Sequence, residues 1–287
     1  MTGEPEADVF QGDPITEPLT YPGRIPVGSG ILIDGSFHRL WAANGTEPER
    51  WPSSSTTLAG LIEQHGSTPM SDRVPVVAVG SNASPGQLLR KFHGKTVRPV
   101  IPMTLAEVSH LVAGVSAHVS RPGYIPAVPV KDPGAISRVF VLWLDDSQLG
   151  ILDETEPNYW RRSLPPASFP VVLSSGVSAQ GCHIYVGKHG CLINGQGQPR
   201  RLGDQRTLIE DLLNESAQLR HLCGETAESF VARAQEPAVR EAVQEILAAE
   251  GRVSMQPDLV QLPEELLPGG RGWAPAQRLP VNSRLLA

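Results

Sequence analysis

The segment Val76-Val77-Ala78-Val79-Gly80-Ser81-Asn82 is the most informative stretch of this chain, and Leu152-Asp153-Glu154-Thr155-Glu156-Pro157-Asn158-Tyr159 follows it by about 75 residues. The first is typical of a buried strand that breaks into a turn, because apolar residues are followed by Gly, Ser and Asn. The second ends a hydrophobic stretch in a cluster of carboxylates. A turn with free backbone amides can hold an anion, and a carboxyl group opposite it can move a proton. Together they indicate acid–base chemistry on a small, amino-acid-like substrate.

The composition is that of a globular protein rich in strands and turns. Of the 287 residues, 40% are hydrophobic and 19% are charged, and the 28 glycines and 27 prolines favour short strands over long helices. The net charge of −6 gives no reason to expect nucleic acid or an anionic membrane as a partner. Basic residues near 198–206 and 271–284 form only local groups, so we interpret them as solvated faces.

We expect the protein in the cytoplasm. The first residues are acidic and no apolar stretch follows them, which is unlike a secretory signal. The longest apolar runs, such as 139–144, are far too short to span a bilayer. Cys182, Cys191 and Cys223 are an odd and sparse set, which argues against a disulfide framework.

The pattern divides the chain into four segments. We expect a flexible acidic and Pro-rich arm at 1–26, an N-terminal extension at 27–73, the main domain at 74–225, and a C-terminal helix with a Pro/Gly-rich tail at 226–287. A strand and turn are expected at 31–35, and further strands at 74–79, 99–103, 110–115, 125–130, 138–144, 169–174 and 180–186. A short helix should follow a cap near Asp145, and 204–250 are helical in pattern.

Gly80, Ser81 and Asn82 predict a ligand-binding turn. Gly80 has no side chain, so a ligand can approach the backbone closely, and its two neighbours add short hydrogen-bonding groups. Exposed amides in such a turn suit a carboxylate or an oxyanion. The alternative is an ordinary turn at the end of a strand, which these three residues alone would favour.

Asp153, Glu154 and Glu156 predict an acid–base residue. One carboxyl group that is partly buried against the neighbouring aromatic residues would have a raised pKa and could both take and give a proton. The alternative is a solvated helix end, although acidic residues at the C-terminal end of a helix oppose the helix dipole.

Zinc binding is an alternative role for the region that contains Cys182-His183 and His189-Gly190-Cys191. No second pair has ligand spacing, so we predict no metal. A short β-hairpin that contains these residues would account for the same pattern equally well.

In order and spacing, these motifs resemble the gamma-glutamylcyclotransferase-like superfamily. That family has a Tyr-Gly-Ser-Asn-type loop after its first strand, and Val79-Gly80-Ser81-Asn82 matches three of the four positions. Residues 123–128 look like its Gly-rich segment, and 139–162 look like its strand, short helix and Leu-Asp-x-x-Glu motif. The resemblance covers about 75–220. It implies an α+β fold, a small mixed β-barrel or curled sheet with surrounding helices, to which this chain adds the N-terminal extension.

The resemblance also implies an activity. Glu156 takes the place of the family's acid/base residue, and the loop takes the place of the segment that holds the gamma-glutamyl group. The implied reaction is a cyclotransferase-type acyl transfer, of the acyltransferase or lyase kind, that releases 5-oxoproline and an amine from a small gamma-glutamyl compound without metal or cofactor. The oligomeric state stays open. The candidate substrate-binding residues are Val79, Gly80, Ser81, Asn82, Tyr124 and Tyr159.

The chain departs from the family pattern at three points. Val79 stands where the loop has Tyr, Pro157 stands where Gly is usual, and the linker to Tyr159 is shorter. These departures favour a second hypothesis, a non-catalytic small-molecule-binding or interaction module with the same fold, whereas the presence of Glu156 favours the enzyme. A third hypothesis is hydrolysis with Glu156 activating water, and its product would be free glutamate in place of a lactam.

Overall fold

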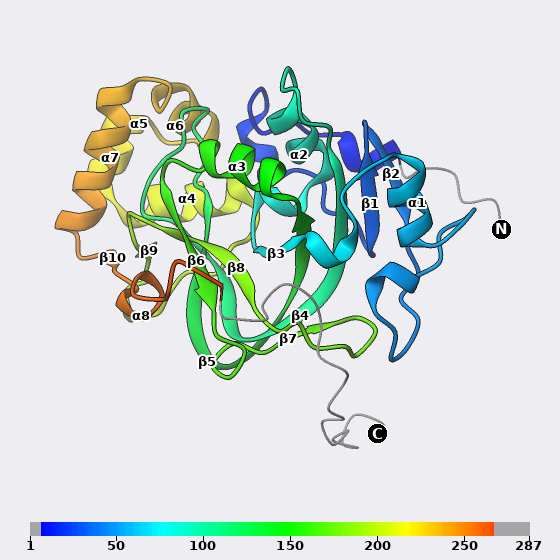
Figure 1. The fold of residues 1–287 in the computed structure, drawn as a ribbon. Helices are drawn as coiled ribbons and strands as arrows, with labels where there is room; N and C mark the ends of the chain where they lie inside the picture. The colour runs from blue at the N-terminus through cyan, green and yellow to red at the C-terminus, as the bar shows by residue number, and fades with distance from the viewer. Residues whose placement is uncertain (1–6, 267–287) are drawn as a thin grey trace, which may run out of the picture.

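The computed structural model describes residues 7–266, and these form a mixed α+β fold around a central sheet (Figure 1). The strand order is β2-β1-β4-β5-β3-β8-β6, with β7 paired to β4. All of these pairs are antiparallel except β3 and β8, which are parallel, so the predicted α+β class with a mixed sheet is confirmed. The strands are β1 (Gly30–Ile33), β2 (Ser36–Arg39), β3 (Val74–Ala78), β4 (Val100–Val115), β5 (Ala127–Leu144), β6 (Tyr159–Leu164), β7 (Val171–Leu173) and β8 (Cys182–Gly187), and a second small sheet pairs β9 (Cys191–Leu192) with β10 (Val253–Ser254).

The helices lie around this sheet (Figure 1). None of those in the described part of the chain combines the length and the apolar character needed to cross a bilayer. They are α1 (Leu58–Gln64), α2 (Pro85–Phe92), α3 (Asp146–Glu154), α4 (Gln205–Glu215), α5 (Ala217–Cys223), α6 (Ala227–Arg233), α7 (Pro237–Ala249) and α8 (Pro257–Val260), with short 3-10 turns at η1 (Ala7–Phe10), η2 (Pro18–Thr20), η3 (Pro48–Arg50), η4 (Met70–Asp72) and η5 (Ser81–Ala83).

The sheet is open within residues 7–266. Its order begins at β2 and ends at β6, and no pairing joins these two strands in the described chain. Of the two forms expected, the arrangement is compatible with the curled sheet and is not a closed barrel.

Two pairs of expected strands are each one long strand. β4 covers the ranges expected at 99–103 and 110–115 from residue 100 onward, and β5 covers those expected at 125–130 and 138–144 from residue 127 onward. The pairing shifts register between Ser109 and Leu111, where His110 has a φ of 63°. Such a bulge lets a strand pair continue past a local irregularity. The predicted breaks are therefore wrong, because long-range pairing overrides the turn signals between them.

Both faces of the sheet are buried. Along β5, Val141 and Trp143 face a cluster that α1 completes, whereas Leu142 and Leu144 face a cluster that α2 and α3 complete. A strand buried on both faces reads as a continuous apolar run and not as an alternation. This explains the unbroken apolar residues at 139–144.

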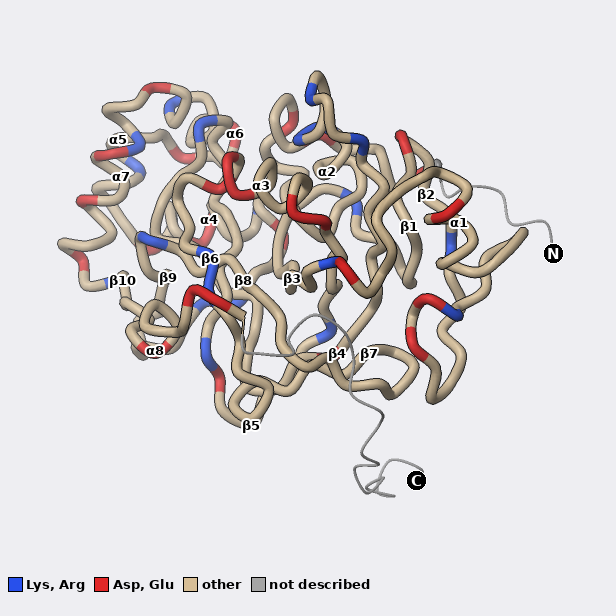
Figure 2. The backbone as a smooth tube through the Cα atoms, in the orientation of Figure 1, with Lys and Arg blue, Asp and Glu red and all other residues tan. Residues whose placement is uncertain are grey.

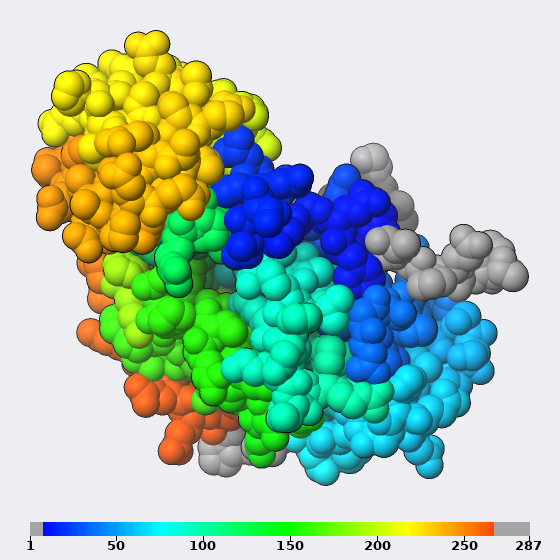
Figure 3. Space-filling model, turned by 90° about the horizontal axis from the view of Figure 1, so that it is seen from above, coloured from blue at the N-terminus to red at the C-terminus, as the bar shows by residue number. Residues whose placement is uncertain are grey.

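The C-terminal helices α4 to α7 form a third apolar cluster with Val115 and Leu192. The region that reads as helical over 204–250 is broken into four helices, since Ser216 and Thr226 cap new helix starts and Pro237 begins α7. Figure 3 shows these helices, coloured yellow to orange, as a lobe beside the rest of the molecule.

Residues 7–26 lie against the body of the protein. η1 contacts α2, and η2 contacts α4 and α6, so this segment bridges the C-terminal lobe and α2 (Figure 3). Tyr21 is only 6% exposed. The next element, the β1–β2 hairpin, continues the main sheet because β1 pairs with β4. The first and last parts of the expected arm and tail, 1–6 and 267–287, lie outside the described residues.

Arg73 is fully buried just before β3, and its hydrogen bonds connect three parts of the fold. Burial lowers the pKa of its guanidinium to about 10, which leaves it charged at neutral pH. It donates hydrogen bonds to the backbone carbonyls of Thr68, Val100 and Trp143 and to the side chains of Gln148 and Ser67.

We predict that Arg73→Met lowers the free energy of unfolding by about 3 kcal/mol, because buried carbonyl oxygens lose their donor. Arg39→Met, at an exposed position on β2, is the control and should change stability by less than about 0.5 kcal/mol. Urea denaturation followed by circular dichroism measures both. Equal stability of Arg73→Met and the wild type would contradict this role.

Candidate functional site

The two informative stretches of the sequence meet at one end of β3. β3 and β5 are antiparallel, with Val74 opposite Leu144, so α3 begins beside the start of β3. A helix of nine residues spans about 13 Å and a strand of five residues about 16 Å, so α3 returns the chain to the far end of β3. Asp145 and Gln148 form a capping box that starts α3 at this point. Asn82 in the turn after β3 donates a hydrogen bond to Glu156 Oε1 at 3.0 Å.

The Glu156 carboxylate is paired with a lysine that the sequence analysis missed. Lys91 Nζ on α2 lies 2.5 Å from Glu156 Oε1 and 2.6 Å from Asn82 Oδ1. The Lys91 and Glu156 side chains are 6% and 11% exposed. A buried ion pair needs further hydrogen bonds to offset the loss of hydration, and Asn82 supplies them to both partners. The sequence held one signal of a buried lysine. Lys91 stands three residues after Leu88, so both side chains lie on the same, buried face of α2.

The four tyrosines of the chain all lie at this site. Tyr159 donates to the carbonyl of Ala127 at 2.9 Å, and Tyr185 on β8 donates to Asp153 Oδ1 at 2.8 Å. Burial raises the pKa of both hydroxyls. These two hydroxyl groups therefore stay protonated, and their hydrogen bonds fix the positions of the segments that surround the site.

Tyr21 reaches the same place from the N-terminal segment. Its ring stacks on Tyr124 at 4.3 Å, and its oxygen accepts a hydrogen bond from the Ala127 N–H at 2.8 Å. Burial raises the pKa of Tyr21, and backbone hydrogen bonds from Ala127 and Ser81 act in the opposite direction. Within residues 7–266 no acceptor for the Tyr21 proton is found, so that proton remains available to a ligand.

Gly80 makes room for this tyrosine. A Cβ atom at Gly80 would lie 2.6 Å from the Tyr21 hydroxyl oxygen and 2.8 Å from Ala127 Cβ. Real Cβ atoms do not approach other atoms this closely, so only glycine fits here. The space expected to admit a ligand to the Gly80 backbone is therefore filled by Tyr21.

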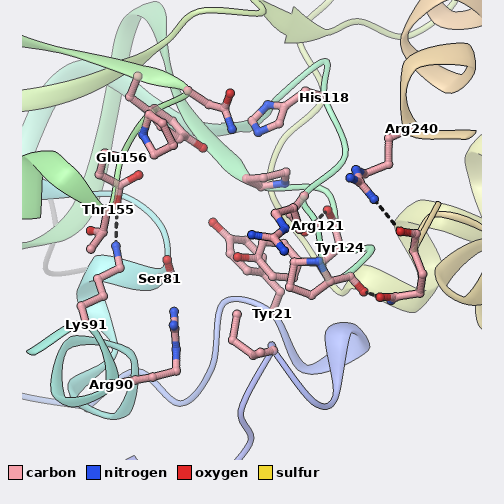
Figure 4. A pocket seen from close by; sticks show the side chains of 18 of the residues that line it. Tyr21, Ser81, Arg90, Lys91, His118, Arg121, Tyr124, Thr155, Glu156 and Arg240 are labelled. Carbon is pink, nitrogen blue, oxygen red and sulfur yellow. Dashed lines mark hydrogen bonds and ion pairs between the residues drawn. The ribbon is translucent and has the colours of Figure 1, made fainter. Parts of the chain in front are cut away.

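Two cavities meet at Glu156. The inner one has about 30 Å³, room for one small group, and lies between the 79–82 loop, Glu156, Tyr21 and Tyr185. The outer one has about 820 Å³ and opens between α2, the loop before β5 and the C-terminal helices (Figure 4). Tyr21, Ser81, Glu156 and Tyr159 line both cavities. A ligand in the outer cavity could therefore reach the inner one with a single polar group.

The structure brings all seven predicted site residues to these cavities. Ser81, Tyr124, Glu156 and Tyr159 line the outer cavity, and Val79, Gly80 and Asn82 line the inner one. Lys91, Tyr21 and Tyr185 were missed because no local pattern links them to the loop. Their positions follow from packing between distant segments.

The other two carboxylates of the cluster have different environments. Glu154 is 66% exposed and pairs with Lys95 at 2.9 Å, so the interpretation as a solvated helix end fits this residue. Asp153 accepts from Arg161 at 3.1 Å as well as from Tyr185, and it therefore holds β6 and β8 beside α3.

The cysteine and histidine residues form no metal-binding group in the described chain. Cys182, Cys191 and Cys223 are free and buried. Residues 7–266 contain no group of three or more His, Cys, Asp or Glu that could hold a metal ion. Cys182 and His183 lie on β8, where the His183 ring contacts Arg161 at 3.0 Å.

His118 is a buried histidine in the wall of the outer cavity. Its Nδ1 lies 2.5 Å from Ser116 Oγ, and its ring lies 4.6 Å from that of His189. Burial, with a smaller effect of His189, lowers the pKa of His118 to about 3. The unfolded chain binds a proton on this histidine below about pH 6.5, whereas the folded protein does not until about pH 3, so stability falls as the pH falls.

We predict that His118→Gln reduces the loss of stability between pH 7 and pH 5 by on the order of 2 kcal/mol relative to the wild type. Urea unfolding at both pH values provides the comparison. Parallel pH curves for His118→Gln and the wild type would show that His118 is not held neutral by the fold.

Comparisons with known proteins return low similarities. No family model matches the chain, and no curated protein matches it significantly. Similar solved structures include a gamma-glutamyl cyclotransferase, at 14% identity over 60% of this chain and 99% of that chain, with a TM-score of 0.33. They also include an uncharacterized protein from Homo sapiens, at 20% identity over 40% of this chain and 67% of that chain, with a TM-score of 0.32. A third is a protein from Arabidopsis thaliana, at 15% identity over 40% of this chain and 62% of that chain, with a TM-score of 0.31. At these values the family of the chain stays a proposal.

Proposed function

We propose that the protein catalyses a gamma-glutamyl cyclotransferase-type reaction, releasing 5-oxoproline and an amine from a gamma-glutamyl compound. The observation that carries this proposal is the position of the Glu156 carboxylate. It is 11% exposed, lies against the turn after β3, and borders both an inner polar cavity and an outer cavity large enough for a small substrate. A carboxylate placed in this way can move a proton between two nitrogen atoms of one bound molecule.

Proton transfer would use one oxygen of Glu156. Oε1 accepts from Lys91 and Asn82, and the described residues provide no hydrogen bond to Oε2. The neutral alpha-amine attacks the gamma-carbonyl carbon, and Glu156 accepts the proton that the attacking nitrogen loses. The bond from that carbon to the leaving nitrogen then breaks, and Glu156 gives the proton to the leaving nitrogen. The attack is intramolecular, so the protein mainly has to fold the substrate correctly.

Tyr21 would stabilise the oxyanion that forms in this reaction. Its oxygen is polarised by the backbone N–H groups of Ala127 and Ser81, and its own proton has no acceptor among residues 7–266. A donor fixed in advance and aimed at the developing charge is effective in a site shielded from water. In this mechanism Tyr21 supplies a hydroxyl group to a loop that has Val79 in place of tyrosine.

The Lys91–Glu156 contact favours a second candidate function. A carboxylate held by a lysine at 2.5 Å is already neutralised, which suits a site that binds a zwitterion without converting it. This candidate is a small-molecule-binding module with the same pocket. Product analysis separates the two, because only the enzyme makes 5-oxoproline.

We predict that Glu156→Gln lowers kcat for 5-oxoproline release by about 10²–10⁴-fold, because an amide cannot carry the proton. The variant should still fold, because the amide oxygen can accept from Lys91 and Asn82, but with a lower free energy of unfolding, because the buried Lys91 loses its ionic partner. The matched control is Glu154→Gln, an exposed acid two residues earlier, which should keep at least about half of the activity. Chromatographic detection of 5-oxoproline provides the measurement. Wild-type turnover by Glu156→Gln would remove the central residue of this proposal.

We predict that Tyr21→Phe lowers kcat by about 10–100-fold with a smaller change in KM, because the lost donor acts mainly in the transition state. A modest loss of stability accompanies it, since the backbone N–H of Ala127 loses its acceptor. Thr16→Val removes a hydroxyl group from the same segment without touching a cavity and should leave kcat unchanged. If Tyr21→Phe raised KM alone, Tyr21 would be a binding residue and not an oxyanion donor.

A further inference from the structure

The outer cavity is positively charged in an acidic protein. Among the described residues, its lining contains the cationic side chains Arg90, Lys91, Arg121 and Arg240, and one carboxylate, Glu156. The net charge of the whole chain is −6, so these cations do not follow from composition. Figure 2 shows acidic and basic residues interspersed along the outer helices. By contrast, most of the charged side chains that line this cavity are cationic. Concave walls with one sign of charge concentrate ligands of the opposite sign.

Three arginines come to the cavity from three different parts of the chain. Arg90 lies in the last turn of α2, Arg121 lies in the loop between β4 and β5, and Arg240 lies on α7 (Figure 4). Because these segments are far apart in sequence, only the fold brings the three guanidinium groups to one cavity. Such convergence from separate elements distinguishes this cavity wall from a run of surface charge along one helix.

The guanidinium groups differ in how much of their hydrogen-bonding capacity is used. Arg121 is exposed and has no hydrogen-bond or ion-pair partner among residues 7–266. Within residues 7–266 the Arg240 guanidinium donates only through Nη1, to the carbonyls of Ala234 and Gln235 at 2.7 and 2.9 Å. Arg90 donates to Gln87 at 3.2 Å and lies 3.9 Å from Asp13. Free donors therefore remain on each group, and most remain on Arg121.

Lys91 neutralises the Glu156 carboxylate, the charge in the described cavity lining that would repel an anion. Lys91 Nζ contacts Glu156 Oε1 at 2.5 Å, so this end of the cavity is close to neutral. An acidic group held by the arginines would therefore meet no unpaired carboxylate from the cavity wall.

We propose that the outer cavity is a subsite for acidic groups on the leaving amine, so that the preferred substrate is a gamma-glutamyl compound whose leaving amine is itself an acidic amino acid or peptide. This inference rests on the proposed function, which identifies the gamma-glutamyl group as the part of the substrate that lies at the inner cavity. A guanidinium group binds a carboxylate or a phosphate in a bidentate manner, and Arg121 has the free fork that such binding requires. The gamma-glutamyl part would lie at Glu156 and Tyr21, and the acidic part would extend toward Arg121 and Arg240.

The test compares gamma-glutamyl-glutamate with gamma-glutamyl-glutamine, which have nearly the same size and differ by one carboxylate. We expect kcat/KM to be about tenfold higher for gamma-glutamyl-glutamate at low ionic strength, and we expect added salt to reduce this preference. Arg121→Gln should reduce the preference to about threefold or less, since one of several cations is lost. Arg201→Gln, whose arginine is exposed, paired with Asp132 and absent from the cavity lining, should retain it. Gamma-glutamyl-phosphoserine, as a third substrate, shows whether phosphate replaces the carboxylate.

Binding measurements separate this inference from the proposed function. Calorimetric titration of the same two dipeptides into Glu156→Gln protein measures affinity without turnover. Tighter binding of gamma-glutamyl-glutamate, lost in an Arg121→Gln, Glu156→Gln double variant, supports the acidic subsite even if the wild type releases no 5-oxoproline. Turnover without any preference for the acidic substrate overturns the subsite and leaves the proposed function standing. Equal affinity for both dipeptides likewise overturns the subsite.

Discussion

The pairing of β3 with β5 on one side and β8 on the other positions the whole site. β5 leads directly into α3, which returns along β3 and brings Glu156 to the turn that follows β3. β8 is parallel to β3, with Val77 opposite Ile184, so Tyr185 lies beside the end of β3. The central strands are buried on both faces, and a rigid, well-packed sheet holds these groups at fixed positions.

The polar centre of the site is stable only as a set. Glu156, Lys91 and Asn82 form a triangle of contacts at 2.5, 2.6 and 3.0 Å, with both charged side chains almost buried. A buried charge without its partner is costly, so each member fixes the others. The same contacts leave one oxygen of Glu156 toward the cavities. A single arrangement thus accounts for the stability of the buried acid and for its proposed use in proton transfer.

The segments outside the predicted main domain complete the cavities. The N-terminal segment contributes Tyr21, whose hydroxyl group occupies the space beside Gly80. The C-terminal helices contribute Arg240, which joins Arg121 from the loop between the two long strands of the predicted main domain. The inner cavity is thus built mainly by the sheet and its turns, whereas the charge of the outer cavity comes from elements packed around the sheet. In the proposed reaction the first would hold the gamma-glutamyl group and the second would select the leaving amine.

Local signals in the sequence were sufficient for the parts of the fold that depend on neighbouring residues. The apolar run before Gly80 predicted β3 and its turn, and the cap near Asp145 predicted α3, because both patterns act over a few residues. The same stretches pointed to Glu156 and the 79–82 loop. The merging of the strands, the contact between Lys91 and Glu156, and the positions of Tyr21 and the three arginines could not be predicted, because they depend on contacts between segments far apart in the chain. A side chain such as Tyr21, which contacts Ala127 more than a hundred residues away, carries no local sign of its role until the packing of the sheet and helices brings the two together.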